Sequence, residues 1–207
     1  MRRLLLILFT IAGVALGWRW ASRHRSLPCP TWAAWLLDNP FTETIAGTET
    51  TLDRIGLRPG QRGLDVGCGP GRLSIPAARR AGPEGAILAY DVQPGMLDLV
   101  RRRVAEARLT NVETRLGDIA TDAGLGAASF DRAWLVTVLG EIPDRAAALR
   151  NLYRVLKPGG TLSITEIVGD PHYQRRSAVI SLCQEAGFQP ANYWGTALAF
   201  TQNVVKP

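Results

Sequence analysis

The chain has 207 residues, 46% hydrophobic and 20% charged, a composition typical of a folded domain and not of a disordered chain. Its formal net charge of +6 gathers at the N-terminus, because residues 1–30 hold five arginines and no acidic residue. The remaining residues carry 19 basic and 18 acidic side chains, which excludes a basic nucleic-acid groove across the domain.

The cysteines and histidines are too few and too scattered for a disulfide framework or a metal site. Cys29, Cys68 and Cys183 form no CxxC pair, and His24 and His172 lie far apart. We therefore expect no metal and a reduced, cytosolic setting for the folded domain.

Residues 1–25 predict a single membrane anchor. The stretch from Leu4 to Trp18 is uncharged, and as a helix it would be about 22 Å long, short of the roughly 30 Å hydrocarbon core. Trp18 and Trp20 at the interface with a snorkelling Arg19 would complete a span, although a helix in one leaflet would look similar. A cleaved signal peptide and a buried core helix are the alternatives.

The arginines around this segment favour a domain that faces the cytoplasm, because slightly more of them follow the segment than precede it. Residues 26–50 then predict a helical segment, after a linker over residues 21–30. Trp32, Trp35 and Leu36 have helical spacing, which fits either a helix that caps the domain or an interfacial helix at headgroup level. We place the catalytic domain at residues 51–207.

From residue 60 onward, short apolar runs alternate with helical patterns, which is typical of a doubly wound α/β sheet. In chain order, strands are expected at residues 62–67, 85–91, 111–118, 130–139 and 160–168, and helices at 72–82, 94–109, 143–156 and 175–188. We expect Lys157 to Gly160 to end the third helix. Residues 189–207 predict two closing strands joined near Gly195.

The first strand ends in "LDVGCGPG", a glycine turn that opens a helix and so presents backbone N–H groups to a ligand. Gly67, Gly69 and Gly71 are spaced G-x-G-x-G, whereas a dinucleotide-binding turn has G-x-G-x-x-G. Asp65 precedes them, and its carboxylate would repel a pyrophosphate but attract an ammonium or sulfonium cation. The turn therefore favours S-adenosylmethionine.

Two further aspartates follow at the ends of the second and third strands. Asp91 can accept hydrogen bonds from both ribose hydroxyls, and Asp118, after Gly117, can accept one from the adenine amino group. An aspartate at a strand end is often only a helix cap or a turn residue. Three of them at the carboxyl ends of consecutive strands, where open α/β sheets bind ligands, indicate a binding site.

The set "LDVGCGPG", "AYD", "GD", "FD" and "LYRVLKPGG" resembles class I S-adenosylmethionine-dependent methyltransferases over roughly residues 50–207. The likeness is greatest to the small-molecule and lipid branch, which includes ubiquinone, menaquinone and phospholipid methyltransferases. The resemblance implies a Rossmann-like, mostly parallel sheet of seven strands with an antiparallel last strand and helices on both faces, here preceded by a membrane helix.

The resemblance also implies roles for residues of the cofactor site. Asp65 and the turn would hold the methionine part, Asp91 with Val92 the ribose, and Asp118 with Ile119 the adenine. The pocket beneath the sulfonium would be lined by Val136, Thr137 and Leu139.

Candidates for a general base lie on the acceptor side of the expected sheet. Glu166 closes the fifth strand, and the loop "DPHYQ", with His172 and Tyr173, follows it. His172 fits a solvent-facing loop residue equally well, and Tyr173 a packing residue. Glu141 stands where relatives often have a histidine, and Gly140 beside it leaves room, so a transferred role there has weak support.

The sequence predicts a membrane-anchored methyltransferase for a lipid or lipophilic acceptor. A phosphatidylethanolamine-type headgroup amine is favoured, and an isoprenoid quinone or a lipophilic thiol or small molecule is the alternative, because tethering would concentrate such acceptors at the site. No nucleic-acid methyltransferase signature is present, and the oligomeric state is open. An NAD(P)-binding oxidoreductase and a non-catalytic membrane-bound partner are the alternatives from other classes.

Overall fold

A computed structural model describes residues 47–121 and 124–207, together with Gly17 and Thr31. Apart from these two residues and the start of the domain, the anchor predicted over residues 1–25 and the helical segment predicted over residues 26–50 lie outside the described part of the chain. No helix within the described ranges combines the length and apolar character needed to cross a membrane.

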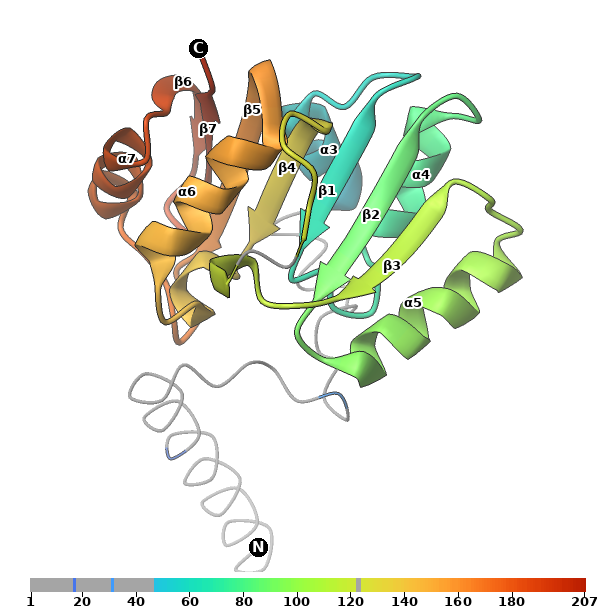
Figure 1. Cartoon of the computed structure of the whole chain (residues 1–207). Coiled ribbons are helices and arrows are strands. Elements are labelled where there is room, and N and C mark those ends of the chain that lie inside the picture. Colours follow the sequence, from blue (N-terminus) through green and yellow to red (C-terminus); the bar gives the residue numbers. More distant parts are fainter. Residues whose placement is uncertain (1–16, 18–30, 32–46, 122–123) are drawn as a thin grey trace, which may run out of the picture.

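The described chain forms one seven-stranded sheet in the order β3-β2-β1-β4-β5-β7-β6 (Figure 1). The strands are β1 (Arg62–Val66), β2 (Ala86–Asp91), β3 (Val112–Leu116), β4 (Phe130–Val136), β5 (Leu156–Ile167), β6 (Gln189–Gly195) and β7 (Ala199–Val205). Neighbours from β3 to β5 are parallel, and β7 is antiparallel to both β5 and β6. The predicted mostly parallel sheet with an antiparallel last strand is confirmed.

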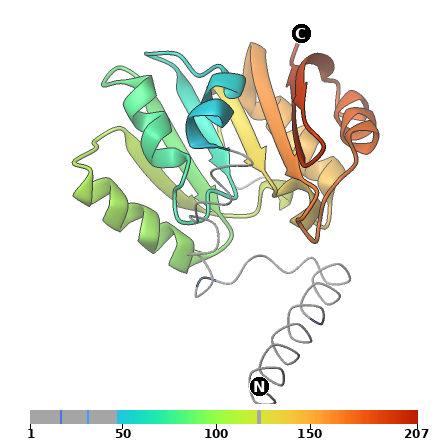
Figure 2. The same cartoon turned by 180° about the vertical axis from the view of Figure 1, so that it is seen from behind.

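Helices cover both faces of the sheet (Figures 1 and 2). They are α3 (Thr48–Ile55), α4 (Ser74–Ala81), α5 (Pro94–Glu106), α6 (Arg145–Val155) and α7 (Arg176–Glu185), with the short 3-10 helices η2 (Ile119–Thr121) and η3 (Leu139–Glu141). Because successive side chains of a strand point to opposite faces of the sheet, the hydrophobic core has one part on each face. Leu64 and Val66 of β1 pack with the core of α6 and α7, whereas Trp134 of β4 packs with that of α3 and α4.

Local sequence explains where the helices begin. Pro94 stands at the start of α5, where its missing N–H costs nothing, and Met96, Leu97 and Val100 form the buried stripe expected from their spacing. Asp144 caps α6 by accepting a hydrogen bond from the backbone N–H of Ala147 at 2.9 Å.

The segment after α6 differs from its prediction. We expected Lys157 to Gly160 to form a turn that ends the helix, but β5 begins directly at Leu156. Tertiary pairing causes the difference, because Gly159 N–H donates to the carbonyl of Lys206 at 2.8 Å and Lys206 N–H donates to that of Gly160 at 2.9 Å. These residues therefore extend the sheet beside the end of the chain.

The carboxyl ends of β1 to β5 meet along one edge of the sheet, at the lower side of Figure 1, and the glycine turn leaves β1 there. Gly67 has φ +67°, and a Cβ on it would lie 2.5 Å from Cγ2 of Val138, which follows β4. Only glycine fits this position, because both the left-handed backbone and the close approach exclude a side chain.

We expect Gly67→Ala to destabilise the fold more than Gly56→Ala. Gly56 has a nearly identical φ of +68° but no heavy atom within 4 Å of a Cβ placed there, so its substitution carries only the backbone cost, about 1 kcal/mol. The overlap with Val138 adds roughly 1–3 kcal/mol. Chemical denaturation of both variants measures the difference, and equal losses of unfolding free energy would contradict the steric account.

Candidate functional site

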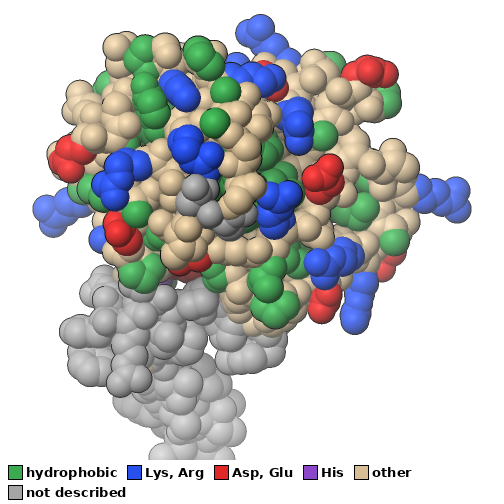
Figure 3. All heavy atoms as spheres, in the orientation of Figure 1, with side chains coloured by type: hydrophobic (Ala, Val, Ile, Leu, Met, Phe, Trp, Pro, Cys, Tyr) green, Lys and Arg blue, Asp and Glu red, His purple; other side chains and the backbone are tan. Residues whose placement is uncertain are grey.

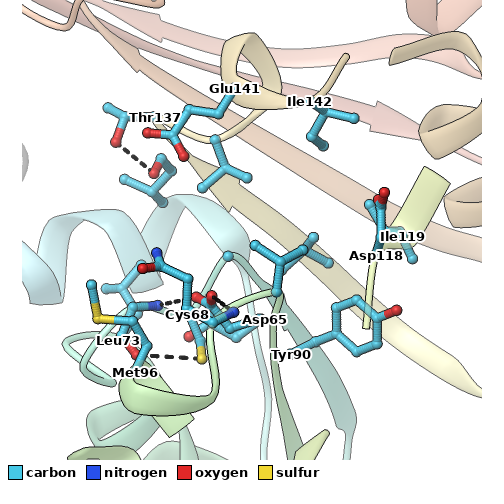
Figure 4. Close-up of a pocket in the computed structure, with 18 of the residues that line it drawn as sticks. Asp65, Cys68, Leu73, Tyr90, Met96, Asp118, Ile119, Thr137, Glu141 and Ile142 are labelled. Atoms are coloured by element: carbon cyan, nitrogen blue, oxygen red, sulfur yellow. Dashed lines mark hydrogen bonds between the residues drawn. The ribbon is translucent and has the colours of Figure 1, made fainter. Parts of the chain in front are cut away.

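A cavity of about 240 Å³ opens at the carboxyl edge of the sheet, between the glycine turn and the segments that follow β2, β3 and β4 (Figure 4). Its lining combines carboxylates with apolar side chains. The lining residues are Asp65, Val66, Gly67, Cys68, Gly69, Pro70, Arg72, Leu73, Tyr90, Asp91, Val92, Gln93, Met96, Gly117, Asp118, Ile119, Val136, Thr137, Val138, Glu141, Ile142, Pro143 and Ile167.

The glycine turn is held against the end of β2. The N–H groups of Gly67 and Cys68 both donate to the carbonyl of Tyr90, at 2.8 and 3.2 Å, and the N–H of Gly69 donates to Oδ2 of Asp91 at 2.9 Å. Gly71 lies outside the lining, and a Cβ on it would be 3.2 Å from Cγ2 of Val100 in α5. The third glycine therefore allows close helix packing, whereas the first two form the cavity wall.

Asp65 is a buried carboxyl at the base of the cavity, with 4% of its surface exposed. Its Oδ2 accepts a hydrogen bond from the hydroxyl of Ser74, in the first turn of α4, at 2.6 Å. Burial raises the pKa of Asp65 to about 7, and the Ser74 hydroxyl and the charge of Arg72 only partly offset this effect. The protein thus supplies too little positive charge at Asp65 to keep it ionised in the usual acidic range.

Asp91 and Asp118 stand on the neighbouring strand ends. Asp91 is buried, which raises its pKa, and its carboxylate accepts from the N–H groups of Gly69 and Gln93, each at 2.9 Å. Oδ1 of Asp118 accepts from the N–H of Ala120 at 2.8 Å, a turn hydrogen bond within the start of η2. Each carboxylate is oriented by backbone groups and retains acceptor capacity toward the cavity.

The opposite wall is formed by the end of β4 and by η3. Thr137 has φ +57°, a strained conformation for a β-branched residue. Its N–H donates to the carbonyl of Thr165 at 2.8 Å, and its hydroxyl donates to that of Val136 at 2.7 Å. The strained turn brings Val136, Thr137 and Val138 to the cavity, in agreement with the sequence prediction for the first two.

Glu141 lies across the cavity from Asp65 and Cys68 (Figure 4). Burial raises the pKa of its carboxyl to about 8, and the negative charges of Asp170, Asp91 and Glu166 act in the same direction. A carboxyl with this pKa can take up a proton near neutral pH.

Three other predicted catalytic residues lie outside the cavity lining. Glu166 is buried behind it, with its pKa raised to about 8 by burial, and its Oε2 accepts from the N–H of Gln174 at 3.1 Å. His172 is buried by the packing of its loop on Gly140, where a Cβ would overlap the His172 carbonyl oxygen. The room expected beside Gly140 is therefore filled.

The third of these residues, Tyr173, is partly buried against the core, and Leu139, predicted to line the pocket, is also outside the lining. Tyr173 makes an edge-to-face contact with Phe200, their ring centroids 6.2 Å apart. Leu139, expected to line the pocket, is fully buried in the core instead. Its place in η3 turns its side chain into the fold while Glu141 reaches the cavity.

Several lining residues were missed by the sequence reasoning. Tyr90 and Gln93 flank Asp91, and Met96 is one turn further along, so their nearness to a motif was a usable signal. Val138 and Ile142 carry no such signal, because only the course of the chain after β4 brings them to the cavity.

Comparison with known proteins gives a family for this site. Residues 64–160 match the model of a family described as "Methyltransferase domain". They cover just under half of the chain and are similar to methyltransferase domains. The match begins within β1 and ends in β5, so it includes the glycine turn, the three aspartates and Glu141.

Two curated relatives are similar to part of the chain. Nocamycin O-methyltransferase of Saccharothrix syringae is 38% identical over 120 residues, which are 58% of this chain and 42% of the relative. Demethylmenaquinone methyltransferase of Listeria monocytogenes is 39% identical over 123 residues, 59% of this chain and 52% of the relative. The chain thus spans only about half of the relatives' length.

The fold of the domain matches a solved structure as well. A SAM-dependent methyltransferase from Aquifex aeolicus superposes with a TM-score of 0.80 at 22% identity, covering 86% of this chain and all of that one. The fold is therefore one that a SAM-dependent methyltransferase adopts. The two curated relatives carry the names of small-molecule methyltransferases, and the cofactor named for the solved structure is S-adenosylmethionine.

The residues of the cavity fit this cofactor. S-adenosylmethionine carries a positive amine and a positive sulfur, and Asp65 is a buried carboxylate whose ionised form lacks enough countercharge. The backbone of Gly67 and Gly69 lines the cavity without a side chain, which allows a ligand to approach the turn closely. Asp91 and Asp118 offer acceptors at the next two strand ends, a suitable spacing for hydroxyl and amino donors.

We expect Asp65→Asn to stabilise the ligand-free domain at pH 8. A carboxyl with a raised folded-state pKa supports folding below its unfolded pKa of about 3.8 and loses that contribution as the pH rises to about 7. Thermal unfolding from pH 4 to 8 should show the gain of Asp65→Asn over the parent protein growing with pH. A gain that is independent of pH would contradict this account.

Proposed function

We propose that the chain is an S-adenosylmethionine-dependent methyltransferase that acts on a lipophilic small-molecule acceptor, and that residues 1–25 anchor it in a membrane with the domain facing the cytoplasm. The observation that carries the proposal is the cavity itself. Three aspartates on consecutive strand ends face an apolar wall with a single glutamate, Glu141. Such a site suits a cationic donor on one side and an apolar acceptor on the other.

The cofactor roles follow from the donors and acceptors around the cavity. Asp65 would pair with the amino group of the methionine part beside Gly67, Cys68 and Gly69, and Asp91 would accept from the ribose hydroxyls. Val92 would contact the ribose, and Asp118 with Ile119 would hold the adenine. The bound cofactor supplies a methyl group on a positively charged sulfur.

Transfer of that methyl group requires mainly that the acceptor be held in line, and close positioning can supply on the order of 7–11 kcal/mol. Val136, Thr137 and Ile142 form the wall that would orient an apolar acceptor and exclude water. Glu141 would take the proton from an acceptor hydroxyl or amine, since its carboxyl is the titratable group on that wall. Glu166 would not contact the acceptor, but its negative charge helps to raise the pKa of Glu141.

Different observations favour different acceptors. The names of the two relatives point to a quinone precursor or a hydroxyl-bearing small molecule. The negative charges near Glu141 favour instead a cationic group such as the amine of phosphatidylethanolamine, the acceptor expected from the sequence. The quinone precursor and phosphatidylethanolamine are both lipophilic, and one experiment distinguishes these two acceptors.

We expect S-adenosylhomocysteine to bind about tenfold more weakly for each pH unit below 7, because its amino group requires Asp65 to be ionised. Asp65→Asn should weaken binding by roughly 1.5–3 kcal/mol and remove the pH dependence. Titration calorimetry measures both effects. Asp131→Asn is the matched control, because that carboxylate pairs with Lys157 at the far end of β4 and should leave affinity unchanged.

The same calorimetry addresses the other functional classes. Tight binding of NAD(P) with no binding of S-adenosylhomocysteine would overturn the methyltransferase proposal in favour of an oxidoreductase. If Asp65→Asn binds S-adenosylhomocysteine as tightly as the parent protein, only the role of Asp65 would be refuted, and the methyltransferase proposal would stand.

Labelled methyl from S-adenosylmethionine should appear in the lipid extract when the full chain is added to membranes. Separate vesicles with phosphatidylethanolamine and with a demethylated quinol distinguish the two acceptors. Label in neither lipid, with the cofactor bound normally, would reject a lipid acceptor.

We expect Glu141→Gln to lower kcat by about 10²–10⁴ while S-adenosylhomocysteine affinity changes little. In the parent protein, kcat should rise as the pH increases toward about 8, since the base acts when ionised, and Glu141→Gln should lose this rise. Glu84→Gln, an exposed substitution before β2, is the control. A parent-like pH profile in Glu141→Gln would contradict the assignment of the base.

A further inference from the structure

The exposed large hydrophobic side chains of the described residues gather along one edge of the sheet. They are Val92, Leu116, Val168, Tyr193 and Leu198, each between 45% and 55% exposed. All five lie at or near the carboxyl ends of β2, β3, β5 and β6 or in the turn between β6 and β7. We call these five residues the apolar rim. Among the described residues, the opposite edge of the sheet carries none of this kind.

The apolar rim has two parts that lie on either side of the cavity. Val92 lines the cavity after β2, and Leu116 is next to it, because Leu116 pairs with Asp91 across β2 and β3. On the other side, Val168 N–H donates to the carbonyl of Leu198 at 2.8 Å, directly after Ile167, which lines the cavity. The opening is therefore bordered by apolar side chains on both sides.

Tyr193 and Arg176 give the second part an amphipathic margin. The guanidinium carbon of Arg176 lies 4.1 Å from the ring centroid of Tyr193, and its Nε donates to Oε1 of Gln202 at 2.9 Å. A tyrosine with an arginine stacked on it presents an apolar ring beside a charged head. That combination is suited to the boundary between lipid chains and headgroups.

Thr31, the described residue that precedes the domain, lies at this same edge. A Cβ on Gly95, at the start of α5, would lie 3.0 Å from Cγ2 of Thr31, so these two residues are neighbours. The domain then starts at α3, where the hydroxyl of Thr48 accepts from Nη1 of Arg72, a cavity residue, at 3.3 Å. In the sequence, the uncharged stretch Leu4 to Trp18 ends thirteen residues before Thr31.

Figure 3, in the orientation of Figure 1, shows hydrophobic side chains at the lower margin of the domain as well as elsewhere on this face, with charged side chains among them. Exposed apolar side chains that border the opening of a cavity on both sides are suited to an interaction site. Thr31 and Thr48 both lie near this margin, so an anchor before residue 31 would be attached on the side of the domain where the cavity opens.

We propose that the apolar rim rests on the surface of a lipid bilayer, so that the cavity opens into the membrane and takes its acceptor from there. This proposal rests on the anchor and the lipophilic acceptor of the proposed function. Burial of apolar area at the headgroup boundary supplies the driving force. An acceptor then passes from the lipid to the cavity between Val92 and Val168 without crossing water.

An environment-sensitive dye on Leu198→Cys tests the contact without any need for catalysis. The full chain carries Cys29→Ser as a background, so that the dye labels one position. Cys68 and Cys183 are buried, and burial raises the pKa of both thiols, that of Cys183 to about 12, which protects them from labelling. Ala127→Cys, exposed in the loop before β4 at the opposite edge, is the matched control.

With phosphatidylcholine vesicles, we expect the emission at position 198 to shift to shorter wavelength and to be quenched by brominated lipid chains, while position 127 shows neither change. Emission at position 198 that is the same with and without vesicles, for protein that co-sediments with them, would overturn the proposal. A dye at 198 that is already shielded in buffer would also overturn it, and would show that another part of this chain or a second copy covers the rim.

A paired variant links the contact to turnover. Val168→Asp with Leu198→Asp should slow methylation of an acceptor in vesicles severalfold more than methylation of the same acceptor in detergent micelles. Equal slowing in both would refute entry from the bilayer. Insertion of the dye without methylation of any acceptor would reject the proposed function and leave the docking surface intact, so the two failures are distinguishable.

Discussion

The burial of carboxyl groups at the carboxyl edge of the sheet is the physical constraint on which this protein depends. Asp65, Glu141 and Glu166 all have pKa values raised mainly by burial, and Asp91 is raised for the same reason. Such groups destabilise the ligand-free fold at neutral pH, because each ionised form is poorly solvated. A cationic ligand would offset this loss of unfolding free energy by pairing with the buried carboxylates. The ligand-free fold is therefore least stable at the place where the cofactor would bind.

The fold tolerates this cost because the rest of the domain is well packed. Two cores, one on each face of the sheet, hold the strands, and glycines allow the close approaches at the site. Gly67 accommodates Val138, and Gly140 accommodates the loop of His172. The strained backbone of Thr137 is held by hydrogen bonds from its N–H and hydroxyl. The donor and acceptor walls of the cavity are thus positioned by contacts that lie outside it.

The apolar rim relates the proposed methyl transfer to the proposed contact with a membrane. A methyl transfer requires exclusion of water and alignment more than it requires many catalytic groups, and a cavity that opens into lipid would serve both purposes. The rim, the cavity and Thr31 all lie at one edge. This is a consequence of the parallel sheet, because every strand from β1 to β5 delivers its following segment to the same side.

The sequence by itself determined the succession of strands and helices along the chain, the glycine turn and the three aspartates at the strand ends. These features depend on local patterns and on the rule that parallel strands end at one edge. It also named Glu141, but not its advantage over Glu166, His172 and Tyr173 in reaching the cavity. Only the tertiary structure decided that, since the course of the chain after β4 and the packing on Gly140 involve distant residues. The raised pKa of Asp65 and the exposure of the apolar rim likewise depend on which residues the tertiary structure covers. No local sequence pattern contains that information.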